Sequence, residues 1–233
     1  MYLSRIRFLP TSSARAALLK IQQQGSYASH QLLWRLFTEQ NERNFLFREE
    51  QSKGFNGPKG LPEFLVLSEA EPICQEQLFQ IETKLFKPQL SSGDRLAFRL
   101  RANPTIALKS KNPDQKRGGR HDVLMHAKTQ AKIEGETNPE VIQQRMERAA
   151  IDWLTAPARL ERIGIDFDVE PNVCGYSQQR THKKTGRQPI SYSSVDYEGI
   201  LIVKEPGTFL SQLAVGIGRA KSFGCGLMLI RRV

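Results

Sequence analysis

Residues 2–9 read YLSRIRFL, and apolar and polar side chains alternate along them. This alternation predicts a β-strand with Ile6 and Phe8 on the face opposite Arg5 and Arg7. Downstream, the sequence predicts a helical stretch over 16–37 that breaks at Gly25, strands at 45–49 and 64–67, a helix at 73–86 and a strand at 96–100. This order of elements is typical of a ferredoxin-like (RRM-like) domain of βαββαβ type.

The second half of the chain carries a similar set of elements. An apolar stripe at helical spacing predicts a helix over 141–154, and strands are predicted at 165–178 and 190–203. A short helix at 209–215 and a last strand at 227–230 complete the set. We therefore predict an α+β protein with tandem ferredoxin-like domains. The predicted boundaries are an N-terminal domain over 1–102, a basic connector over 103–120 and a C-terminal domain over 121–233.

A glycine-rich loop precedes the last strand. Residues 216–226 read GIGRAKSFGCG and combine four glycines with Arg219 and Lys221. Glycines let backbone N–H groups approach a ligand closely, and with two cations the loop suits phosphates. A plain turn between a helix and a strand would also explain the glycines. The loop alone therefore leaves both interpretations open.

The charge of the chain favours a polyanionic partner. The formal net charge is +10 and the isoelectric point is about 9.7. Residues 1–38 and 206–233 contain no acidic residue, and residues 95–120 contain eight basic residues against Asp114. These three acid-poor segments predict one electropositive surface that binds nucleic acid. A membrane partner is not expected, because the sequence has no long apolar span or basic amphipathic helix.

The cysteines do not form a recognisable pattern. Cys74, Cys174 and Cys225 are odd in number, widely spaced and without a CxxC or histidine partner pattern. Neither a zinc site nor a disulfide framework is therefore expected. The N-terminus has no apolar signal segment, which predicts a cytoplasmic protein.

Five segments carry motifs in a defined order along nearly the whole chain. They are MYLS at 1–4, YASHQLLWRLF at 27–37, NFLFR at 44–48, FRLRANP at 98–104 and the glycine-rich loop at 216–227. Together they resemble the CasE family, the precursor-CRISPR-RNA endoribonucleases of type I-E systems. The resemblance implies selective binding of a repeat stem-loop and one metal-independent cut at its 3′ base, without a cofactor. It also implies that the protein keeps its product and joins other subunits in the Cascade complex.

The resemblance implies catalytic roles for His30 and Tyr27. Metal-free RNA cleavage uses the 2′-hydroxyl as an internal nucleophile, and a histidine suits the proton transfers because its pKa lies near neutrality. Tyr27 lies three residues earlier, on the same side of the helix if the helix extends that far back. The sequence does not assign His30 as acid or base. The cation near the scissile phosphate also stays open among Arg219, Lys221, Lys183 and Arg187.

Stem recognition requires contacts to phosphates and to groove shape. A basic hairpin over 180–187 would enter or flank the groove, and basic residues at 99–111 would follow the backbone. The candidate RNA-binding residues are Arg99, Arg101, Lys109, Lys111, Arg180, Lys183, Lys184, Arg187, Gly218, Arg219, Lys221 and Ser222.

Stacking of single-stranded bases on the sheet is not expected. Phe45, Phe47, Phe64 and Phe98 do not match the RRM aromatic signature and are expected in the core. His121, His126 and His182 are not expected to be catalytic. Two further interpretations stay open at this point: a non-catalytic RNA-binding subunit with the same folds, and a general basic RNA-binding protein of ribosomal type.

Overall fold

The computed structural model describes residues 1–37, 44–51, 61–73, 78–108, 119–181 and 190–233. They divide into two compact units. Unit 1 consists of Met1–Gln89, Gln179–Ser191 and Leu213–Leu227, and unit 2 consists of Leu90–Gln178, Tyr192–Gln212 and Met228–Val233. The glycine-rich loop therefore belongs to the same unit as His30, although 186 residues separate Gly216 from His30 along the chain.

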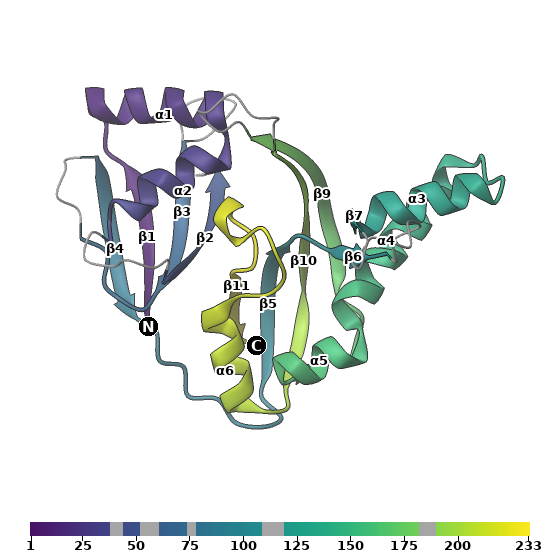
Figure 1. Cartoon of the computed structure of the whole chain (residues 1–233). Helices are drawn as coiled ribbons and strands as arrows, with labels where there is room; N and C mark the ends of the chain where they lie inside the picture. The colour runs from purple at the N-terminus through teal and green to yellow at the C-terminus, as the bar shows by residue number, and fades with distance from the viewer. Residues whose placement is uncertain (38–43, 52–60, 74–77, 109–118, 182–189) are drawn as a thin grey trace, which may run out of the picture. The chain divides into compact units, whose positions relative to one another are not determined.

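Unit 1 has a four-stranded antiparallel sheet and two helices (Figure 1). Its elements are β1 (Tyr2–Phe8), α1 (Ser12–Gln24), α2 (Ser26–Trp34), β2 (Phe45–Gln51), β3 (Pro62–Ser68) and β4 (Phe79–Leu85). The strand order is β2-β3-β1-β4. Numbered along the chain, this is the order of a ferredoxin-like sheet, in which β1 lies between the third and fourth strands.

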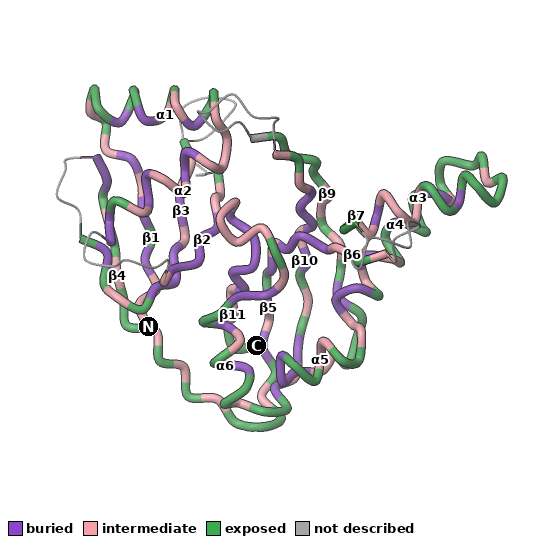
Figure 2. Tube along the Cα trace, viewed as in Figure 1, coloured by how far each residue is buried: buried purple, intermediate pink, exposed green. Residues whose placement is uncertain are grey.

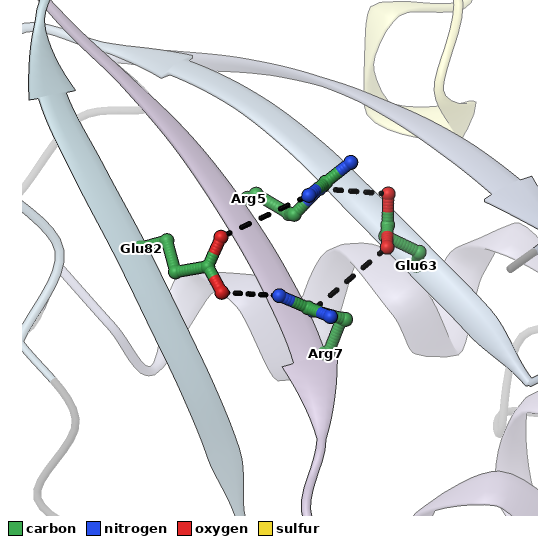
Figure 3. Close-up of polar contacts among 4 residues, drawn as sticks. All are labelled: Arg5, Arg7, Glu63 and Glu82. Carbon is green, nitrogen blue, oxygen red and sulfur yellow. Dashed lines mark hydrogen bonds and ion pairs between the residues drawn. The ribbon is translucent and has the colours of Figure 1, made fainter.

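The two faces of this sheet differ in chemistry. Ile6 and Phe8 are buried against apolar residues of α1 and α2, as the alternation in β1 predicts. On the opposite face, Arg5 and Arg7 form ion pairs across the sheet with Glu63 of β3 and Glu82 of β4 (Figure 3). The Arg5 Nε donates to Glu63 Oε1 at 3.2 Å. The open face is thus a network of paired charges.

Unit 2 contains a second antiparallel sheet with the same topology. Its elements are β5 (Arg95–Ala102), β6 (Thr105–Ala107), β7 (Arg120–Asp122), α3 (Val123–Ile133), α4 (Pro139–Thr155), α5 (Pro157–Ile163), β8 (Ile165–Asp166), β9 (Asn172–Thr181), β10 (Ile190–Val203), α6 (Pro206–Val215) and β11 (Met228–Arg232). The strand order is β11-β5-β10-β8, with β9 also paired to β10. The predicted tandem ferredoxin-like fold is therefore confirmed.

Helix α4 packs its predicted apolar stripe into the core of unit 2. Ile142, Met146, Ala150 and Trp153 are buried along it. The hydroxyl of Tyr197 on β10 donates to the backbone oxygen of Ala150 at 3.0 Å. The buried residues of Figure 2 concentrate in the strands and on the inner sides of the helices.

Two sequence predictions for the first domain are wrong. The predicted helix over 73–86 is the strand β4 over Phe79–Leu85. In addition, the strand predicted at 96–100 forms, as β5, but it pairs with β10 and β11 of the second sheet. The predicted boundary at residue 102 therefore falls within unit 2, as do the residues that flank 109–118.

Some smaller elements also differ from the prediction. Residues 165–178 were predicted as one strand but contain β8 and β9, separated by 167–171 and ending this break at Pro171. Helices α3 and α5 and the β6–β7 pair have no counterpart in the prediction. Among the described residues, no helix is long and apolar enough to cross a membrane.

Candidate active site

Helix α2 carries both predicted catalytic residues. Helix α1 ends at Gly25, whose φ of 63° breaks the helix and whose N–H donates to the backbone oxygen of Ile21 at 2.7 Å. Helix α2 then begins at Ser26, so Tyr27 lies within it. Tyr27 and His30 are three residues apart and therefore lie on the same side of α2. Both are partly exposed, which leaves them accessible to a substrate.

The imidazole of His30 rests against three aromatic rings. Its ring centroid lies 5.6 Å from that of Phe45, with the planes 27° apart, and 5.6 Å from that of Trp34. Phe47 lies at 6.2 Å. Phe45 and Phe47 are buried side chains of β2. Because buried rings hold fixed rotamers, this wall restricts the orientation of the imidazole.

One buried hydrogen bond joins α2 to β2 next to His30. The hydroxyl of Ser29 donates to Glu49 Oε2 at 2.8 Å, and Ser29 is completely buried. A hydrogen bond to an ionised acceptor is stronger than one between neutral groups. The contact therefore fixes how α2 is rotated over the sheet, and with it the direction of His30.

The glycine-rich loop packs beside α2 and against β2. The 3₁₀ turn η1 (Lys221–Phe223) contacts both elements. A Cβ at Gly216 would lie 2.8 Å from both terminal methyl groups of Leu46, and a Cβ at Gly224 would lie 3.3 Å from Phe47 Cε2. The N–H of Ile217 donates to the backbone oxygen of Gly226 at 2.9 Å and closes the loop. Two of the four glycines thus allow close packing on β2.

The structure brings some predicted RNA-binding residues to the catalytic helix. Gly218, Arg219, Lys221 and Ser222 lie in or next to η1, within unit 1. Arg180 is exposed near the end of β9. Arg99 and Arg101 lie on β5 of unit 2. Lys109, Lys111, Lys183, Lys184 and Arg187 lie outside the described residues, as do His182 and the turn of the basic hairpin.

Several cations of the acid-poor segments are paired with acids from elsewhere in the chain. Arg101 forms two hydrogen bonds, both 3.0 Å, with the carboxylate of Asp196. Arg95 lies 2.9 Å from Asp168, and Arg5 and Arg7 pair with glutamates as described above. The expectation that the three segments form one electropositive surface is therefore wrong for these cations. Strand pairing supplies acids that are distant in the sequence.

The remaining candidates agree with a site built from helix and loop residues. The four phenylalanines expected in the core are at most 4% exposed. His121 is exposed on β7 and His126 lies on α3, both in unit 2. Cys174 and Cys225 are free thiols. The described part of the chain contains no group of three or more His, Cys, Asp or Glu residues that could hold a metal.

Sequence reasoning missed Ser29, Glu49 and Trp34. Trp34 follows His30 by four residues, so helical spacing would have placed its ring beside the imidazole. The partners Ser29 and Glu49 are 20 residues apart and lie on different elements. No local pattern signals that pair.

Comparison with known proteins identifies the family. The family model described as "CRISPR associated protein" matches residues 1–232. "CRISPR system Cascade subunit CasE" of Escherichia coli strain K12 is 30% identical over 206 residues, which cover 87% of this chain and 89% of that protein. The chain belongs to the CasE family.

Two solved structures extend the likeness of this CasE family member to three dimensions. A CRISPR endoribonuclease Cse3 bound to a 19-nucleotide RNA is similar with a TM-score of 0.69 and 25% identity, covering 99% of this chain and 100% of that one. Thermus thermophilus Cse3, bound to an RNA that represents a pre-cleavage complex, has a TM-score of 0.65 and 26% identity, covering 99% and 98%. The likeness spans both ferredoxin-like units.

Proposed function

We propose that this CasE family member is a metal-independent endoribonuclease that processes precursor CRISPR RNA in the cytoplasm. It cuts at the 3′ base of the repeat stem-loop and keeps the mature guide RNA as a subunit of Cascade. The observation that carries the proposal is the position of His30, partly exposed on α2 and held between the aromatic wall and the cationic loop. The named activities of the relatives support the same reaction.

The reaction would use the ribose 2′-hydroxyl as nucleophile. A bond forms between O2′ and phosphorus while the bond from phosphorus to O5′ breaks, which gives a 2′,3′-cyclic phosphate and a 5′-hydroxyl. His30 would either take the proton from O2′ or give one to O5′. Tyr27, on the same side of α2, would orient the ribose or donate a hydrogen bond to the phosphate.

Charge builds on the phosphate in the transition state and needs a nearby cation. Arg219 and Lys221 are the described candidates, because η1 packs against α2. Lys183 and Arg187 remain candidates outside the described residues. Under this proposal unit 1 carries catalysis, and Arg99 and Arg101 of unit 2 add contacts to the RNA backbone. Arg101 would then have to exchange its pair with Asp196 for a phosphate.

The test is cleavage of a labelled repeat hairpin in EDTA by the wild-type protein, by His30→Ala and by His121→Ala. His121 is an exposed histidine of unit 2 and serves as the matched control. We expect one cut at the stem base, slowed about 10²–10⁴-fold by His30→Ala and unchanged by His121→Ala, because general acid–base catalysis is worth this much. RNA affinity should change by no more than a few fold, because the imidazole acts in the transition state.

Three results would contradict the proposal. Loss of cleavage in EDTA would refute the internal-nucleophile mechanism. Loss of affinity in proportion to activity in His30→Ala would refute the catalytic role of that residue. Tight binding without any cut by the wild-type protein would establish a non-catalytic RNA-binding subunit instead.

A further inference from the structure

Helix α1 presents an acid-free outer side. Ala14, Ala17 and Ile21 face the core, and the opposite side consists largely of exposed residues (Figure 2). The residues that turn outward or flank the outer side are Ser12, Ser13, Arg15, Ala16, Leu19, Lys20, Gln22 and Gln23. Arg15 and Lys20 stand on either flank of this outer side, five residues or about 7.5 Å apart along the helix axis.

The cations of α1 differ from those of β1, although both belong to the acid-free segment 1–38. Arg5 and Arg7 are neutralised by Glu63 and Glu82 on the open face of the sheet (Figure 3). Among the described residues, by contrast, neither Arg15 nor Lys20 forms an ion pair. The positive charge of the N-terminal segment is therefore left uncompensated on the helical side of unit 1 and not on the open face of its sheet.

The helical side of unit 1 is also the side of the proposed chemistry. Helices α1 and α2 share one hydrophobic core against the same face of the sheet, and they contact each other. Tyr27 and His30 begin only two residues after the end of α1. An RNA whose scissile phosphate reaches His30 therefore passes close to α1, and its neighbouring phosphates require cations on that side.

We infer that the outer side of α1 is a further RNA-binding surface, on which Arg15 and Lys20 contact phosphates of the repeat RNA. The inference rests on the proposed function and deepens it. Amide side chains such as Gln22 and Gln23 also hydrogen-bond phosphates and riboses, and no acid of α1 or α2 repels them. The open face of the sheet, with its paired charges, is excluded as the path of the RNA.

The experiment compares two double variants with the same change in net charge. Arg15→Gln/Lys20→Gln removes the α1 cations, and Arg5→Gln/Arg7→Gln removes the cations of the open face. Hairpin affinity is measured from 50 to 200 mM salt. Each lost phosphate contact removes about 0.9 from the slope of log affinity against log salt, so the α1 variant should lose about tenfold less affinity over this range than the wild type.

Two further readouts belong to the same experiment. The slope of the Arg5/Arg7 variant should match the wild type, because those cations are already paired. Cleavage by the α1 variant at saturating RNA should stay within a few fold of the wild type, because neither side chain reaches the reacting atoms. A circular dichroism spectrum and thermal transition close to those of the wild type show that α1 is intact, since both replaced side chains lie at the surface.

The inference is overturned if the two double variants change the slope equally, since net charge alone would then explain the effect. It is also overturned if the α1 variant keeps the wild-type slope. If that variant binds RNA normally but no longer assembles with the other Cascade subunits, α1 is a protein interface instead. A wild-type protein that neither binds nor cuts the hairpin would refute the proposed function itself, which distinguishes the two failures.

Discussion

Gly216→Ala adds one methyl group where the glycine-rich loop meets β2. That methyl would lie 2.8 Å from both Cδ atoms of Leu46 and 3.2 Å from the backbone oxygen of Gly226. Leu46 is only 2% exposed, so its methyl groups have no solvent space into which to move. Gly216 also has a φ of 82°, a conformation that residues with a Cβ adopt at a cost.

The magnitude follows from these two effects. A positive φ costs an L-residue about 1–2 kcal/mol. Overpacking of a filled site costs about 1–3 kcal/mol more, which gives a loss of about 2–5 kcal/mol in the free energy of unfolding. Gly135→Ala is the matched control. Gly135 has a φ of 86°, but its Cβ would meet no atom within 4 Å, so only the backbone effect of about 1–2 kcal/mol is expected.

Urea unfolding of both variants measures the difference, and single-turnover cleavage measures its consequence. Displacement of the loop from Leu46 moves η1 away from α2, so Gly216→Ala should also slow cleavage of the repeat hairpin. Gly135, in the turn between α3 and α4 of unit 2, should leave the rate unchanged. Equal loss of stability in the two variants would refute the packing argument. An unchanged rate in a clearly destabilised Gly216→Ala would refute the link between loop and site.

Two other predictions concern hydrogen bonds. Ser29→Ala removes a buried donor to Glu49 and should lower the free energy of unfolding by about 1.5–3 kcal/mol. It should also slow cleavage at saturating RNA, whereas Ser12→Ala, on the exposed first turn of α1, should do neither; equal rates would remove Ser29 as a positioning residue. Burial raises the pKa of Tyr176 to about 12, so its contribution to stability is complete below pH 10 and is lost as the pH rises through 12. Tyr176→Phe should flatten that loss in urea unfolding series at increasing pH, and a parallel curve would contradict the assignment.

Local periodicity predicts most elements of this fold, but it does not predict which strands pair. The alternation in β1, the helix break at Gly25 and the apolar stripe of α4 are all visible in the sequence and present in the structure. The segment Phe79–Leu85 was misread because Ile81 and Leu85 are four residues apart, a spacing that fits a helix as well as a strand. Pairing of β4 with β1 decides the matter, and it lies beyond any local window.

The assignment of β5 failed for a related reason. Residues 95–102 alternate as a strand should, and four strands were needed to complete the first domain. The alternation is equally compatible with pairing to β1 or to β10 and β11. Partners of Arg5, Arg7 and Arg101 were missed in the same way, since each acid comes from a strand that only the sheet brings close.

The candidate site divides along the same line. The spacing of Tyr27 and His30 could be predicted, but the stacking of His30 on Phe45 and the pair of Ser29 with Glu49 join separate elements. These long-range contacts restrict both the rotation of α2 and the orientation of its imidazole.

The two interpretations of the glycine-rich loop are compatible with each other. Gly216 and Gly224 are accounted for by close packing on Leu46 and Phe47. Between these two anchor points lies the segment with Arg219 and Lys221, which is therefore held next to α2 before any RNA is present. A cationic loop that is already in place loses less conformational entropy when a phosphate binds, and its charge needs no rearrangement as the transition state forms. Packing glycines at the ends of the loop thus support phosphate binding at its centre.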